Sequence, residues 1–239
     1  SNKEIKNIGH YLVLGDIVEN NTAAEWEYAA SQFKKLEAVG LPYTPTWGYS
    51  HDGLKGEEFT TYFGTSSNFD GVVSYGTDAT KRLANYYRTF TVGTTDYMIL
   101  SLGWLPNADV LSWASEAIDA YSDHKVIIIT HYYLLTDATV SEEAIAIWND
   151  LVSLNSNVVL VMSGHIQYAS NIVRTEHKGQ AGHTVTEMLI NPQYMDKYYG
   201  YGSTGSVAML YFSENGSKVR AEYISTPKTR ENNNKDVLF

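Results

Sequence analysis

Short apolar runs on either side of one amphipathic helix constrain the fold of this chain most. The run HYLVLGD at residues 10–16 is too brief for a helix and stops at a Gly-Asp turn, so it predicts a buried strand. Over residues 22–39, apolar residues recur every three or four positions and Gly40 follows them, as in an amphipathic helix with a glycine C-cap. LPYTPTW at residues 41–47 begins a second strand. This order predicts a βαβ unit, in which a helix covers two parallel strands.

The alternation continues through the middle of the chain. The same patterns predict strands at residues 97–105, 125–133 and 158–166, and helices at residues 108–122 and 141–154. HTVTEMLIN and residues 205–225 then predict two or three strands, with a hairpin at a Glu-Asn-Gly turn. Residues 55–96 and the Asn-rich stretch 231–235 have weak periodicity, and we expect insertions or loops there. The predicted fold class is α/β with mixed sheets.

Composition narrows the class of protein. With 239 residues and 44% hydrophobic content, the chain is expected to form a single domain over residues 1–239, with residues 228–239 as an exposed tail. The opening Ser-Asn at residues 1–2 resembles a remnant of expression cloning, so the natural protein is expected to continue upstream of Lys3. No apolar stretch reaches the roughly 20 residues that span a bilayer, so no membrane span is expected in this chain.

Charge and cysteine usage exclude some partners and cofactors. The 17 Lys and Arg residues are scattered and outnumbered by 27 Asp and Glu, a net charge of −10, which argues against a nucleic-acid partner. The chain has no cysteine, so a metal would be held by histidine, carboxylate, amide or water. No sequence feature fixes an oligomeric state.

Four predicted strands end in polar side chains. Taken alone, a histidine after a strand is more often a packing residue, and an aspartate after glycine is a common turn residue. Four strands that end in polar side chains favour a ligand-binding site, because ligands of open α/β sheets bind outside the carboxyl ends of the strands. Carboxylate and imidazole donors suit zinc, manganese or iron. These strand ends supply Asp16, the group Ser50, His51 and Asp52, then His131 and His165.

The order of these motifs resembles the calcineurin-like metallophosphoesterase family, in particular its secreted bacterial members. The stretches that carry the resemblance are GDIVEN (15–20), GYSHDG (48–53), THYY (130–133) and GHIQ (164–167). It implies a sandwich of two mixed β-sheets flanked by helices, and a secreted or cell-surface location. The family's first signature, Asp-x-His or Asp-x-Gln on an earlier strand, does not precede GDIVEN in this chain.

The resemblance also implies a metal site of one or two divalent cations. Asp16 would bridge the two metals, and His131 and His165 would bind the second one. Ser50 stands where the family has a bridging Asn, and Gln167 stands where it has a last histidine, so the first metal would have few ligands.

Catalytic roles follow from the same resemblance. His51 would contact the scissile phosphate and protonate or stabilise the leaving oxygen, with Asp52 orienting it. Tyr194 lies in the loop YMDKYYGYG (194–202), which either stacks on a substrate or is half-exposed packing.

Two functions remain open from the sequence. The first is a metal-dependent hydrolase of phosphomonoesters or phosphodiesters, acting on a small-molecule or surface substrate. The second is a family member that keeps the fold but not turnover, and serves as a binding or scaffold domain, because lost ligands cost metal affinity.

Overall fold

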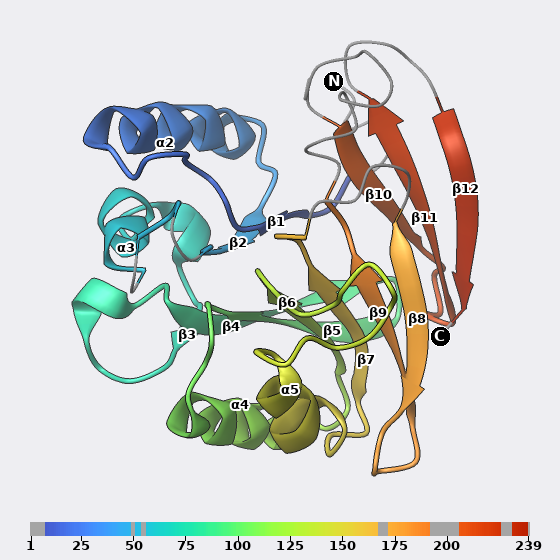
Figure 1. Cartoon of the computed structure of the whole chain (residues 1–239). Coiled ribbons are helices and arrows are strands. Elements are labelled where there is room, and N and C mark those ends of the chain that lie inside the picture. Colours follow the sequence, from blue (N-terminus) through green and yellow to red (C-terminus); the bar gives the residue numbers. More distant parts are fainter. Residues whose placement is uncertain are drawn as a thin grey trace.

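A seven-stranded mixed sheet runs through the centre of the protein (Figure 1). The computed structural model describes residues 8–48, 51–53, 56–166, 172–191, 206–225 and 231–238. In spatial order the sheet comprises β3 (Val73–Ser74), β4 (Asn85–Val92), β5 (Thr95–Leu102), β6 (Lys125–Thr130), β7 (Val158–Ser163), β9 (Thr184–Leu189) and β8 (Val173–Lys178). β5, β6, β7 and β9 are parallel neighbours, whereas β3, β4 and β8 pair antiparallel. The α/β fold class expected from the sequence is confirmed.

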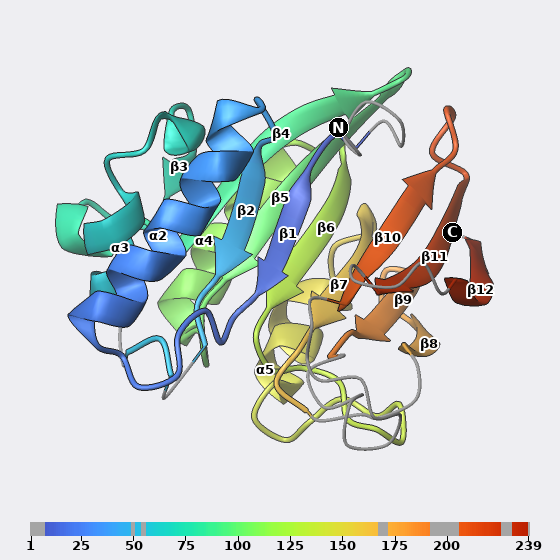
Figure 2. The ribbon, with the colours of Figure 1, turned by 90° about the horizontal axis from the view of Figure 1, so that it is seen from above.

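Two smaller sheets lie over one face of this central sheet. β1 (Tyr11–Leu14) and β2 (Tyr43–Thr46) are parallel, and β10 (Ser206–Phe212), β11 (Lys218–Ser225) and β12 (Glu231–Leu238) form an antiparallel sheet. Figure 2 shows β1 and β10 above β6 and β7. The second layer is therefore divided into two sheets. Most of the Asn-rich tail, where we expected a loop, lies in β12 because it pairs with β11.

Helix α2 (Ala23–Ala38) connects β1 to β2 and completes the predicted βαβ unit. Its start is set by Thr22 and Glu25, which form a capping box. Its end is followed by Gly40 at a left-handed φ of 61°. Trp26 packs from α2 onto the aromatic residues of α3 (Glu57–Phe63), including Phe59 and Phe63.

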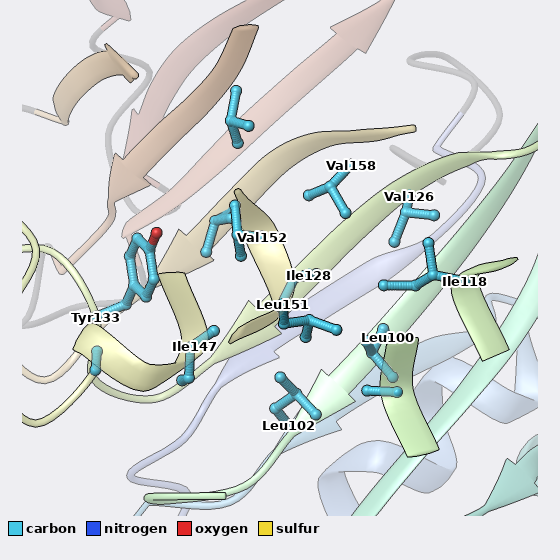
Figure 3. Packing of buried hydrophobic residues seen from close by; sticks show 14 of the residues in the cluster. Leu100, Leu102, Ile118, Val126, Ile128, Tyr133, Ile147, Leu151, Val152 and Val158 are labelled. Atoms are coloured by element: carbon cyan, nitrogen blue, oxygen red, sulfur yellow. The ribbon is translucent and has the colours of Figure 1, made fainter. Parts of the chain in front are cut away.

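The other face of the central sheet is covered by α4 (Ala108–Ala120) and α5 (Ile145–Ile147), as Figure 1 shows. α5 runs into a wider turn at Trp148–Val152, so the helix predicted at 141–154 is shorter and less regular than expected. Leu111 and Ile118 of α4 and Leu151 of the wider turn pack on buried residues of the sheet such as Leu100 and Ile128 (Figure 3). Burial of this apolar surface, at about 25 cal/mol per Å², is the main source of stability.

The segment 55–96 is more regular than its sequence predicts. It contains α3, short 3-10 turns at Ser67–Phe69 and Ala79–Lys81, and the strands β3 and β4. The expectation of an insertion or loop is wrong for these parts. No helix in the described part of the chain is long and apolar enough to cross a membrane.

A groove of about 1130 Å³ lies between β1 and β10. The groove is lined by consecutive residues of both strands and their flanks, at 8–16 and 207–212. Successive side chains of a strand point to opposite faces, so a run of consecutive residues means that each strand borders the groove with its edge. Among the described strands, β1 pairs only with β2, and β10 pairs only with β11. The floor includes Ile99, Ile127 and Met162 of the central sheet. The groove leads to Asp16, His131 and His165.

One carboxyl group is buried within the sheet. Glu187 of β9 has no exposed surface, and it accepts a hydrogen bond of 2.6 Å from the Tyr133 hydroxyl. Its second oxygen contacts Nδ1 of His177 on the edge strand β8. Burial raises the pKa of Glu187, although these two partners lower it. The carboxyl thus links the segment after β6 to two strands of the sheet.

Candidate metal centre

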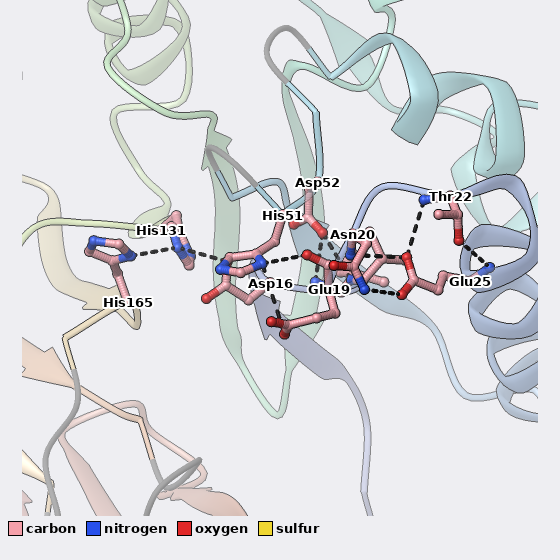
Figure 4. A network of polar contacts seen from close by, with 11 residues as sticks. Asp16, Glu19, Asn20, Thr22, Glu25, His51, Asp52, His131 and His165 are labelled. Atoms are coloured by element: carbon pink, nitrogen blue, oxygen red, sulfur yellow. Dashed lines mark hydrogen bonds and ion pairs between the residues drawn. The ribbon is translucent and has the colours of Figure 1, made fainter.

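Three donor side chains converge at the carboxyl ends of three strands. Asp16 follows β1, His131 follows β6 and His165 follows β7, and one donor atom of each lies within 4.8 Å of the others. Nε2 of His131 lies 3.2 Å from Oδ1 of Asp16 and 3.1 Å from Nδ1 of His165 (Figure 4). The structure therefore brings together three residues that the sequence placed in a metal site.

The hydrogen bond on the far side of the His131 ring decides what its inner nitrogen can do. Nδ1 lies 2.6 Å from the carbonyl oxygen of Leu14, and since a carbonyl only accepts, Nδ1 carries the proton. When the ring is neutral, Nε2 offers a lone pair that faces Oδ1 of Asp16. Oδ1 of Asp16 is buried and has no hydrogen-bond partner. Only a proton or a cation between these atoms removes their repulsion, so the three donors fit a divalent metal.

Electrostatics keep the other two donors in the forms that bind metals. Burial raises the pKa of Asp16, but a proton on Nε2 of His131 would hydrogen-bond to this carboxylate, and this contact together with the charges of His131, His51 and His165 lowers the pKa overall. The pKa of His165 is lowered by burial and by the charge of His131. Asp16 is thus an anion and His165 a neutral imidazole near neutral pH, as metal coordination requires.

Two glycines allow the backbone to approach this centre. A Cβ atom on Gly15 would lie 2.3 Å from Nδ1 of His131, and one on Gly48 would lie 2.7 Å from Oδ1 of Asp16. Asp16 and His165 themselves have left-handed φ angles of 53° and 60°. Non-glycine residues seldom adopt this conformation, and such strain is concentrated at functional sites.

Asp52 contacts the main chain of both loops beside the site. Its carboxylate is fully buried and accepts hydrogen bonds from the amides of Ile17 (2.7 Å), Val18 (3.1 Å) and Gly48 (2.7 Å). Burial raises its pKa to about 6, while the three amides lower it. These contacts join the loop after β1 to the loop after β2. The contacts of the Asp52 oxygens in the described residues are with backbone amides and not with the His51 ring, so the expectation that Asp52 orients His51 stays a prediction.

His51, from the loop after β2, is close enough to Asp16 to feel the charge of its carboxylate (Figure 4). Its Nδ1 is 2.7 Å from the carbonyl oxygen of Glu19, so Nδ1 donates and Nε2 is left for other partners. The hydrogen bond to Glu19 raises its pKa, burial lowers it, and the charges of Asp16, Glu19 and Asp52 raise it further. The side chain is 37% exposed, so a ligand from solvent can reach it.

Three predicted site residues, Ser50, Gln167 and Tyr194, lie outside the described residues. Two aromatic residues that border the site were not singled out from the sequence. Trp104 follows β5 and Tyr132 follows His131, and both rings lie next to the His165 ring. The only available signal was their position just after predicted strands, in GWLP and THYY.

Comparisons with known proteins give a distant relative and no family. No family model matches the chain. The chain is 28% identical over 241 residues to YvnB of Bacillus subtilis (strain 168), a protein named as uncharacterized; the match covers 99% of this chain and 18% of YvnB. The chain thus spans about a fifth of that relative's length.

A solved structure named as a proposed 5'-nucleotidase from Staphylococcus aureus, in complex with alpha-ketoglutarate, has a TM-score of 0.43 and 9% identity to this chain. The superposition covers 89% of this chain and 40% of the other. A likeness this low carries no argument about function.

Proposed function

We propose that this chain is a metal-dependent phosphoester hydrolase. The observation that carries the proposal is the convergence of three donor side chains, with Nε2 of His131 3.2 Å from Oδ1 of Asp16 and 3.1 Å from Nδ1 of His165. Such an arrangement is stable when a cation lies among the three atoms. The motif order that resembles metallophosphoesterases supports phosphoester chemistry for that cation.

A divalent cation supplies Lewis acidity, which polarises a phosphoryl oxygen and activates water near neutral pH. The chain's own residues hold and orient the reactants. Asp16, His131 and His165 would bind the metal, and the Leu14 carbonyl fixes the ring of His131. Three protein donors leave room for a water or substrate oxygen, as in mononuclear hydrolytic sites.

His51 would protonate the leaving oxygen. Its Nδ1–H is engaged by the Glu19 carbonyl, and protonation at Nε2 is favoured by the neighbouring carboxylates. The imidazolium would interact with the phosphoryl group and donate a proton from Nε2 as the ester bond breaks. Asp52 supports this role indirectly, because it ties the loop that carries His51 to the loop after β1.

Substrate binding is expected to require the metal. Apart from the site's own histidines, the charged groups that shift the pKa values of His51 and His165 are the carboxylates Asp16, Glu19, Asp52 and Glu143. Without a cation this surface repels a phosphate anion. The protein should therefore bind inorganic phosphate measurably in zinc or manganese, and not after treatment with a chelator.

The proposal is tested by metal content and turnover together. Metal-free protein is loaded with zinc or manganese, the bound metal is measured by elemental analysis, and phosphate release is followed with phenyl phosphate and with a phenyl phosphodiester. His51→Ala should keep the metal and lose about 10²–10⁴-fold in rate. His124→Ala, which changes an imidazole bonded to Asp123, is the matched control and should retain both metal and rate.

Three outcomes separate the functions. Metal binding with hydrolysis that depends on His51 supports the enzyme. Metal and phosphate binding without hydrolysis favours the alternative, a binding domain of the same fold. The proposal is contradicted if His51→Ala hydrolyses the esters at the same rate as the wild type, or if the protein binds neither zinc nor manganese.

A further inference from the structure

Two aromatic rings form one side of the candidate metal centre. Trp104, from the loop after β5, is stacked on Tyr132, with ring centroids 5.5 Å apart and an interplanar angle of 21°. Trp104 also lies 5.2 Å from the ring of His165 and 5.8 Å from that of His131. Tyr132 lies 4.8 Å from the ring of His165. The pair thus borders both imidazoles of the centre.

This aromatic pair packs in part on the core and is in part exposed to solvent. Trp104 packs against the aromatic core built around Trp47 and Tyr86, and both Trp104 and Tyr132 are only half-buried. His165 next to them is exposed, and Leu105 extends the apolar surface with 51% of its area exposed. An apolar rim of this kind is unusual beside a centre whose other neighbours are carboxylates.

We propose that Trp104 and Tyr132 form a subsite for a planar aromatic group carried by the phosphoester substrate. The inference rests on the proposed function, because it places the phosphoryl group at the metal. A ring joined to that group through one ester oxygen would lie within reach of rings that are themselves about 5–6 Å from the metal-binding imidazoles. Flat π-faces stack on other flat rings, whereas a saturated ring of the same size gains only apolar contact.

The expected size of the effect follows from base stacking on aromatic side chains. Loss of one stacking ring by substitution costs about 5- to 150-fold in affinity. A planar ligand should lose this factor when the flat side chain is removed, and a non-planar ligand should lose much less. The chemical source of the ring, a nucleobase or a simple aryl group, is left to the experiment.

The test compares phenyl phosphate with cyclohexyl phosphate, each also as its methyl diester, at saturating zinc or manganese. Trp104→Leu and Tyr132→Leu keep apolar bulk against the imidazoles but remove the flat face. Trp113→Leu is the matched control, because Trp113 packs on Tyr75 and Tyr87 on the α4 side of the sheet. A nucleoside 5'-monophosphate is run in parallel to identify the source of the ring.

The proposal predicts that both site variants lose about 5- to 150-fold in kcat/KM for the phenyl ester, and less than about 3-fold for the cyclohexyl ester. Trp113→Leu should change neither. Each loss is the ratio of kcat/KM in the wild type to that in the variant for the same ester. Phenol is the better leaving group in both proteins, so its effect cancels in this ratio. Equal losses for both esters, together with weaker metal binding, would mean that the rings hold His165, and this would overturn the subsite.

A binding measurement keeps the inference independent of turnover. Phenylphosphonate and cyclohexylphosphonate are titrated into metal-loaded protein by calorimetry. Preference for phenylphosphonate that disappears in Trp104→Leu supports the subsite even if no ester is hydrolysed, in which case only the proposed hydrolytic function fails. Equal affinity of the wild-type protein for the two phosphonates would refute the subsite while leaving hydrolysis unaffected.

Discussion

His131 and Leu14 lie 117 positions apart in the chain and are joined by a 2.6 Å hydrogen bond from imidazole Nδ1 to a main-chain carbonyl. This bond connects the end of β1 to the end of β6, and it fixes the ring so that Nε2 points to Asp16. The partner is a backbone atom, so any side chain at position 14 could supply it. The orientation of the ring therefore depends on the position of β1 over the central sheet.

Removing the charge of Asp16 should weaken metal binding with little effect on the fold. Asp16→Asn keeps the shape of the side chain but replaces an anionic donor, the one with a buried oxygen that has no hydrogen-bond partner. We expect zinc affinity to fall by more than the roughly 10- to 100-fold typical of losing an outer-shell partner. Calorimetric titration measures this, with the exposed Asp119→Asn on α4 as control. Unchanged affinity would remove Asp16 from the centre.

A methyl group on Gly48 should block the centre sterically. The new Cβ would lie 2.7 Å from Oδ1 of Asp16 and 3.0 Å from Nε2 of His131, in the space where a cation would be bound. We expect Gly48→Ala to lose metal binding, at a stability cost of about 1–3 kcal/mol from overpacking. Gly9→Ala, where a Cβ meets nothing within 4 Å, is the control. Full metal occupancy in Gly48→Ala would place the cation elsewhere.

Asp52 should matter more for stability than for chemistry. Asp52→Ala leaves the buried amides of Ile17, Val18 and Gly48 without an acceptor, and each such donor costs about 1–3 kcal/mol. We expect the free energy of unfolding, measured by urea denaturation, to fall by at least about 3 kcal/mol. Asp52→Asn retains one acceptor oxygen and should lose less. A loss no larger than that of the surface variant Asp119→Ala would show that water replaces the carboxylate.

Glu187 should make stability depend on pH. Burial raises the pKa of Glu187 in the folded state above its value in the unfolded state. Below the unfolded pKa the carboxyl is neutral in both states, and its contribution to the free energy of unfolding is fully present. As the pH rises through the folded pKa, the buried carboxyl must ionise and that contribution is lost. Glu187→Gln removes this ionisation and still accepts from Tyr133. The variant should match the wild type at acidic pH and become more stable than it at higher pH. The gain is about 1.4 kcal/mol for each pH unit by which the folded pKa exceeds the unfolded one.

Urea denaturation of both proteins at a series of pH values measures this difference. Glu176→Gln on the neighbouring strand β8 replaces an exposed carboxyl and should show no comparable trend. If the difference in the free energy of unfolding between the wild type and Glu187→Gln does not change with pH, burial does not disfavour the ionised form of Glu187.

The convergence of Asp16, His131 and His165 could be predicted because its signal is local. Each of the three follows a short β-branched or apolar run. His131 and His165 follow neighbouring parallel strands of the central sheet, whose ends meet at one edge, and Asp16 follows β1 of the small sheet that lies over it. The same reasoning did not reveal the contacts of Asp52, since its partners are backbone amides, which every residue has. A carboxylate beside a histidine looks the same in sequence whether it orients the ring or binds the main chain.

Other features lacked a periodic signal. α3 has only 7 residues, too few for a helical stripe, and its burial rests largely on Phe59 and Phe63. β4 is buried at Tyr86 and Tyr87 and half-exposed after them, so it does not alternate over its length. Trp104 and Tyr132 could not be distinguished from core aromatics, because their proximity to His165 arises only when β5, β6 and β7 align in parallel.

The groove between β1 and β10 bears on how copies of this protein behave together. A strand edge without a neighbour presents a row of main-chain donors and acceptors that can pair with another chain, and charged residues or proline usually protect such edges. β1 reads Tyr-Leu-Val-Leu and has neither. Self-association by strand pairing at β1 would therefore take place in this groove, next to the candidate metal centre.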